Sequence, residues 1–169
     1  MKSTSIRTAI GSVLALAVAA SALTCSTAYA AGDMAAFATG GYATGIRTMD
    51  MMHKIDINGD GMISKDEWVA FQEKVFAMLD KKKTGVIDAK EFMTADKQEM
   101  ASFATGGYAR GLLTHKMMTK LDADGDGTIS HDEFMNYQLK IFDMMDTSVA
   151  HKGMLSKSEW FATGGKDSH

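Results

Sequence analysis

Residues 122–133 read Asp122-Ala123-Asp124-Gly125-Asp126-Gly127-Thr128-Ile129-Ser130-His131-Asp132-Glu133. A hard divalent cation binds six to eight oxygen atoms at about 2.3 to 2.6 Å, and this stretch offers oxygens at its positions 1, 3, 5, 7, 9 and 12. They belong to the side chains of Asp122, Asp124 and Asp126, the backbone carbonyl of Thr128, the hydroxyl of Ser130 and the carboxylate of Glu133. Gly127, at position 6, permits the sharp turn that brings them around one ion. The stretch therefore predicts a metal-binding loop.

A second stretch, residues 56–67, follows the same pattern. It has an amide instead of a carboxylate at position 3, and so carries one negative charge fewer. From average composition, five fixed positions match by chance on the order of 10⁻⁶ times per starting residue, so two matches in one chain are not a coincidence. The predicted ligands are Asp56, Asn58, Asp60, the carbonyl of Met62, Ser64 and Glu67.

Both stretches resemble the calcium-binding loops of the EF-hand family, and the resemblance covers nearly all of the chain beyond residue 30. It implies an all-α fold of tandem helix-loop-helix units, with Ca²⁺ as the bound ion. The sequence supports these helices, because apolar residues recur at helical spacing before each loop and large residues follow position 12. The former are Met51, Met52, Ile55, Val75, Phe76, Leu79, Met117, Met118, Leu121, Ile141, Phe142 and Met145, and the latter are Trp68, Phe92, Phe134 and Trp160.

The second half of the chain repeats the first, with equivalent residues 66 positions apart. Residues 37–43 recur at 103–109, and Asp56 recurs as Asp122. We therefore expect two repeats of two hands each, at residues 31–99 and 100–169. The Thr-Gly-Gly sequence in each repeat predicts that one helix stops at a glycine and that a threonine caps the next.

Each repeat also contains a second, poorer loop. Residues 80–91 follow the first loop closely and have a lysine at position 3 and a threonine at position 5. An ammonium group cannot be a calcium ligand, so we expect weak binding or none. The doubtful ligands are Asp80, Thr84, the carbonyl of Val86, Asp88 and Glu91.

The fourth loop, residues 146–159, departs further from the pattern. If Asp146 is position 1, Glu159 stands at position 14 instead of position 12, which indicates an insertion into the loop. Ala150 and Lys152 stand where oxygen ligands are needed. We expect little or no metal binding in this loop.

The spacing of the loops predicts how the four hands pair. Only residues 68–79 separate the first loop from the second, which suits a single helix of about 18 Å. Loops at opposite ends of one rigid helix cannot lie side by side. The longer segment 92–121 has room for two helices and a turn between them, so the second hand can pair with the third. The first hand is then left to pair with the fourth.

This nested spacing, together with the N-terminus, resembles the bacterial lanmodulins, which are secreted four-hand proteins. The resemblance does not extend to the loops. The proline that lanmodulins carry at loop position 2 is absent, because Ile57, Lys81 and Ala123 stand there. Serine replaces their aspartate at position 9, in Ser64 and Ser130. Both departures argue against a preference for lanthanides.

Residues 1–30 have the pattern of a secretory signal peptide. Lys2 and Arg7 precede the apolar run 9–23, and Ala28-Tyr29-Ala30 is a small-x-small cleavage site. Cleavage after Ala30 would leave a chain without cysteine or a membrane segment, and more negative than the formal −3 of the whole chain, in the periplasm or the secreted space. With no basic patch indicated, nucleic acid is not an expected partner.

Three functions are considered for the mature chain. The leading one is a Ca²⁺ sensor or buffer. The second is a soft-metal protein, because Met49, Met52 and His53 share a helix face, as do His115 and Met118, and thioether and imidazole groups suit Cu(I). The third is a calcium-dependent adaptor that binds a protein partner through its methionines. An enzyme is not expected, since the mature chain has no cysteine and no nucleophile motif.

Overall fold

The computed structural model describes residues 40–150 and 152–162, so the proposed signal peptide lies outside the described residues. The described part is mostly helical, with two small antiparallel ladders, in agreement with the expected helical fold. No helix in it is long and apolar enough to cross a membrane. The elements are α2 (Gly40–Ile46), α3 (Met49–Ile55), β1 (Ile63–Ser64), α4 (Lys65–Leu79), β2 (Val86–Asp88), α5 (Ala89–Thr94), α6 (Lys97–Phe103), α7 (Gly106–Leu112), α8 (His115–Leu121), β3 (Thr128–Ser130), α9 (His131–Met145), β4 (Met154–Leu155) and α10 (Lys157–Phe161).

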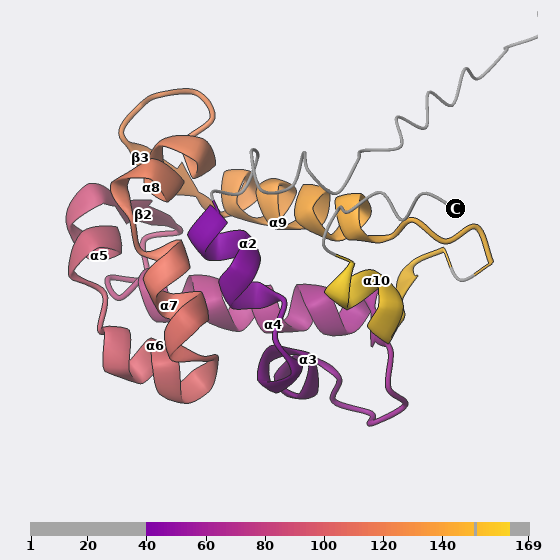
Figure 1. The fold of residues 1–169 in the computed structure, drawn as a ribbon. Helices are drawn as coiled ribbons and strands as arrows, with labels where there is room; N and C mark the ends of the chain where they lie inside the picture. The colour runs from indigo at the N-terminus through magenta and orange to yellow at the C-terminus, as the bar shows by residue number, and fades with distance from the viewer. Residues whose placement is uncertain (1–39, 151, 163–169) are drawn as a thin grey trace, which may run out of the picture.

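Two long helices organise the fold. α4 leaves the first loop and enters the second as one uninterrupted helix, and α9 does the same for the third and fourth loops. This confirms the shared helix that the short spacing of the loops predicts. Ser64 and Ser130 begin the two helices with capping boxes, in which serine and glutamate side chains satisfy N–H groups that the first turn leaves unpaired. α4 and α9 lie side by side, with hand pairs at their opposite ends (Figure 1).

The ladders confirm the nested pairing of the hands. β1 of the first hand pairs with β4 of the fourth, with Ile63 opposite Leu155. β2 of the second hand pairs with β3 of the third, with Ile87 opposite Ile129. All four of these side chains are fully buried, so each ladder contributes an apolar pair to the core.

The apolar residues predicted from helical spacing form one core. All twelve that precede the loops are buried, as are the four large residues after position 12. Trp68 and Trp160 pack edge to face with ring centroids 6.2 Å apart, which joins the first and fourth hands. The core therefore runs through both hand pairs and does not divide at the boundary between the sequence repeats.

The segment between the second and third loops contains four short helices, α5 to α8, and the expectation of two was wrong. The reason is local capping. The side chains of Asp96, Thr105 and Thr114 each accept a hydrogen bond from a backbone N–H at the start of the next helix. Each of these residues has an extended backbone and restarts the helix in a new direction.

The Thr-Gly-Gly sequence is only partly explained by helix capping. Thr105 caps α7 as expected, but Gly106 and Gly107 lie inside the first turn of α7 and do not end the preceding helix. The packing of α2 on α7 instead requires glycine at Gly45 and at Gly111, where an added Cβ would lie 2.5 Å from the carbonyl oxygen of Gly41. An added Cβ on Gly45 would lie 2.5 Å from the carbonyl oxygen of Gly107. These glycines therefore allow the two helix backbones to touch.

Two buried hydrogen bonds cross between the sequence repeats. The Tyr42 hydroxyl donates to Gln138 Oε1 on α9 at 2.7 Å, and the Tyr108 hydroxyl donates to Gln72 Oε1 on α4 at 3.1 Å. Burial raises the pKa of both tyrosines, so their hydroxyls remain neutral donors. Tyr108 is the repeat equivalent of Tyr42, and Gln138 is that of Gln72. Each repeat thus donates the equivalent hydrogen bond to the other, as two repeats related by a local two-fold axis would do.

Candidate metal centre

All four loops share one hydrogen-bond frame around the first aspartate. In each loop the N–H of the glycine at position 6 donates to that aspartate, as Gly61 does to Asp56 at 2.9 Å and Gly127 to Asp122 at 3.1 Å. Gly127 has φ of +87°, a conformation that a side chain would strain. The equivalent bonds in the poorer loops run from Gly85 to Asp80 and from Gly153 to Asp146, so Gly153 marks position 6 of the fourth loop.

The last glutamate of each loop joins the loop's beginning to its end. In the third loop Glu133 Oε1 accepts from the N–H of Ala123 at 2.8 Å and of Asp124 at 3.2 Å. Its Oε2 accepts from the Ser130 N–H and hydroxyl at 2.8 and 2.7 Å. The bonds from Ser130 lower the pKa of Glu133 to about 2, so its carboxylate stays charged. Glu67 has the same contacts in the first loop.

The third loop also gathers three aspartates. Among the described residues, carboxylate oxygens of Asp122, Asp124 and Asp126 lie within 4.8 Å of one another. Three negative charges held this close repel each other unless a cation neutralises them. The donor set consists of oxygen atoms, as a calcium ion requires. The side chains of the third loop therefore fit such an ion.

The first loop has the same frame with a weaker set of donors. The Asn58 side chain donates from Nδ2 to Asp60 Oδ2 at 3.0 Å, and its Oδ1 accepts from the Asp60 N–H at 2.8 Å. The amide N–H thus already occupies one carboxylate oxygen of Asp60. The loop remains suited to a calcium ion, with one carboxylate fewer than the third loop.

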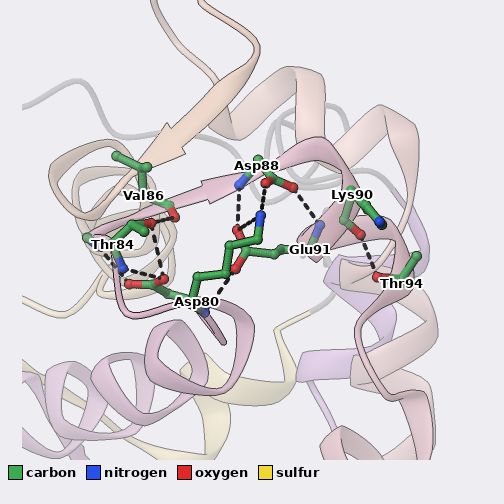
Figure 2. Close-up of polar contacts among 9 residues, drawn as sticks. Asp80, Thr84, Val86, Asp88, Lys90, Glu91 and Thr94 are labelled. Carbon is green, nitrogen blue, oxygen red and sulfur yellow. Dashed lines mark hydrogen bonds and ion pairs between the residues drawn. The ribbon is translucent and has the colours of Figure 1, made fainter.

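In the second loop a lysine occupies the side where the ligands would meet. Lys82 Nζ forms a close ion pair with Asp88 and lies 3.5 Å from Glu91 Oε2. The hydrogen bond with Asp88 raises the pKa of Lys82, and the same bond lowers the pKa of Asp88. Figure 2 shows Asp88 and Glu91 on one side of this loop, facing Asp80 and Thr84 on the other.

The remaining donors of the second loop bond within the loop. The Thr84 hydroxyl donates to the Val86 carbonyl at 2.9 Å, and Asp80 Oδ1 accepts from the Thr84 N–H at 3.0 Å (Figure 2). Together with the contacts of Lys82, these bonds give each of the five doubtful ligands a partner from the protein itself.

The fourth loop contains a second lysine of this kind. Lys152 Nζ donates to the Asp146 carbonyl at 2.8 Å and lies 3.3 Å from Asp146 Oδ2. Glu159 still accepts from the N–H groups of Thr147 and Ser148 at the start of the loop. The closing frame therefore survives the insertion, while a lysine stands beside the first aspartate.

Comparison with known families agrees with this architecture. Residues 70–139 match the profile of an EF-hand domain pair, and residues 48–72 match that of an EF hand. The chain contains EF-hand domains. The matched pair includes the second and third loops, the two that β2 and β3 join. No curated protein and no solved structure gives a significant match. EF-hand domains bind calcium in general and are typically non-enzymatic.

The sequence does not reveal what the lysines of the poorer loops contact. Their positive charge at ligand positions is visible, and by itself it indicates only a loss of binding. Contacts of Lys82 with Asp88 and Glu91 depend on how the loop folds back on itself. Of the methionines considered for copper, two lie in the core: Met52 is 1% exposed and Met118 is 9% exposed, whereas Met49 is 42% exposed. Apolar packing accounts for Met52 and Met118.

Proposed function

We propose that this protein binds two Ca²⁺ ions, one in loop 56–67 and one in loop 122–133, and acts as a calcium sensor or buffer in the periplasm or outside the cell. The observation that carries the proposal is the group of three aspartates in the third loop, closed by a charged glutamate. An EF-hand loop with this donor set provides the oxygen-only shell that Ca²⁺ prefers. The first loop offers the same shell with an amide at position 3.

Each proposed ligand has a defined role. Asp122, Asp124 and Asp126 supply monodentate carboxylates, and Glu133 supplies a bidentate one. The carbonyl of Thr128 and the hydroxyl of Ser130, directly or through water, complete the shell. In the first loop Asp56, Asn58, Asp60, Met62, Ser64 and Glu67 take the corresponding roles.

A calorimetric titration tests the proposal. The purified protein should take up two Ca²⁺ ions per chain, and Glu133→Gln should remove one of them because the bidentate charged ligand is lost. Asp132→Asn is the matched control. It removes the same charge from the neighbouring position, where the side chain is 94% exposed and is no proposed ligand. Loss of a site in both variants, or in neither, would contradict the assignment.

The same titration separates the alternatives. La³⁺ and Cu(I) titrations test lanthanide and soft-metal handling. Binding of Cu(I) at much lower concentration than Ca²⁺ would overturn the calcium proposal. La³⁺ has one charge more and binds the same oxygen ligands more strongly, so it overturns the proposal only if Ca²⁺ itself does not bind. The proposed location rests on residues 1–30, and N-terminal sequencing of the protein recovered outside the cytoplasm should begin at Ala31. An intact Met1 in that fraction would contradict cleavage.

A further inference from the structure

Each hand pair combines one complete loop with one loop that contains a lysine among its ligand positions. The ladder β1–β4 joins loop 56–67 to loop 146–159, and β2–β3 joins loop 122–133 to loop 80–91. In both lysine loops the ammonium group contacts a carboxylate that the EF-hand pattern assigns to the metal. The same arrangement therefore occurs twice, once in each pair.

Lys82 makes the clearest of these contacts. Its side chain starts at loop position 3 and reaches Asp88 at position 9 and Glu91 at position 12. Glu91 is 8% exposed, so its charge is costly without a nearby cation. Lys82 supplies that cation from within the chain. A divalent ion in contact with Asp88 and Glu91 would lie beside the ammonium group and be repelled by it.

Lys152 has the corresponding position in the other pair. It contacts Asp146, whose side chain is almost fully buried and whose Oδ1 has no hydrogen-bond partner among the described residues. The ammonium group neutralises this buried carboxylate. In both loops, then, a lysine meets the electrostatic need that a metal ion meets in a complete loop.

We propose that Lys82 and Lys152 act as tethered cations that replace the metal ion in loops 80–91 and 146–159. These loops then close without calcium. Each keeps its strand, β2 or β4, in position to pair with the strand of the neighbouring calcium loop. In the second hand the closed loop also bonds directly to the third, since the Gly85 carbonyl accepts from the His131 N–H at 3.3 Å. The inference rests on the proposed function only in taking loops 56–67 and 122–133 as the calcium sites.

Thermal unfolding in excess chelator tests the inference without any bound calcium. Lys82→Met should lower the unfolding midpoint by about 2 °C or more, because Asp88 and Glu91 lose their cation. Lys83→Met is the matched control. It removes the same charge from the next residue of the same loop, which makes no salt bridge within the described part of the chain. Equal midpoints for the two variants would overturn the inference.

A second experiment asks whether the lysine keeps calcium out. Lys82→Asp restores a carboxylate at position 3 and should add one Ca²⁺ per chain to the number that the parent binds. Lys83→Asp adds the same charge at a non-ligand position and should add none. If Lys82→Asp does not fold, Lys82→Asn, which copies Asn58 at the same position of the first loop, replaces it.

The outcomes of this second experiment are distinct from those of the proposed function. An extra site in Lys82→Asp that disappears in Lys82→Asp/Glu91→Gln supports the inference, even if the parent binds no calcium. An unchanged stoichiometry overturns it. The inference is also overturned if the single variant Glu91→Gln binds one Ca²⁺ fewer than the parent, because loop 80–91 would then hold calcium despite Lys82.

Discussion

The contact between α2 and α7 yields a sharp prediction about stability. Gly45→Ala would place a methyl group 2.5 Å from the carbonyl oxygen of Gly107 and 2.8 Å from the backbone nitrogen of Tyr108. These atoms belong to a helix and cannot rotate away, so the helices must separate. Overpacking of this kind costs about 1 to 3 kcal/mol. The higher helix propensity of alanine returns at most about 1 kcal/mol. With the full return subtracted, we expect a net loss of up to about 2 kcal/mol.

Gly41→Ala, in the same helix, is the control. Its added methyl would lie 3.7 Å from the nearest backbone atom, which is an ordinary contact. The variant should be as stable as the parent or more stable by up to about 1 kcal/mol. The assay is urea unfolding of the calcium-free protein, followed by tryptophan fluorescence. If the two variants have the same free energy of unfolding, α2 and α7 do not approach as closely as described.

The other predictions concern the loops and the helix that connects them. Loop 122–133 has one carboxylate more than loop 56–67, so Glu133→Gln should weaken the tightest calcium-binding step more than Glu67→Gln does; the reverse order would refute the ranking. The calcium sites of loops 56–67 and 122–133 should bind with positive coupling of about 1 kcal/mol, because α4 connects the first loop to the second, which pairs with the third. Ala70→Pro kinks α4 at an exposed position that is no ligand, and should abolish that coupling in the binding isotherm; a parent with independent sites would refute the mechanism. Hydrogen bonds hold the Glu133 pKa near 2, below its ordinary value of 4.5, so its stabilising effect is complete above pH 4.5 and is lost as the pH falls toward 2. Glu133→Gln removes this titrating group, so the free energy of unfolding of the calcium-free variant should fall less between neutral pH and low pH than that of the parent. An equal fall in both proteins would refute this.

Local patterns are sufficient to predict the loops and their pairing. The ligand spacing of residues 122–133 is complete within one segment, and the short stretch 68–79 between the first two loops leaves no choice but a shared helix. The pairing of β1 with β4 and of β2 with β3 then follows from chain geometry. Such inferences succeed because each depends on a short, continuous part of the sequence.

The features that sequence reasoning misses join residues far apart in the chain. Gly45 touches Gly107, and Tyr42 bonds to Gln138, only because the two repeats exchange partners around a common core. Adjacent glycines predict a helix end from local pattern, since a close backbone contact leaves no local signal. The direction of the Lys82 side chain is equally hidden, because it depends on the closed shape of its loop.

Counting bound ions by native mass spectrometry tests the central claim most directly. At calcium concentrations that saturate the tight sites, the parent protein should carry two Ca²⁺ ions per chain. The double variant Glu67→Gln/Glu133→Gln should carry none, since each substitution removes the bidentate carboxylate of one complete loop. A parent with four equally tight ions, or a double variant that still holds two, would contradict the assignment of calcium to loops 56–67 and 122–133.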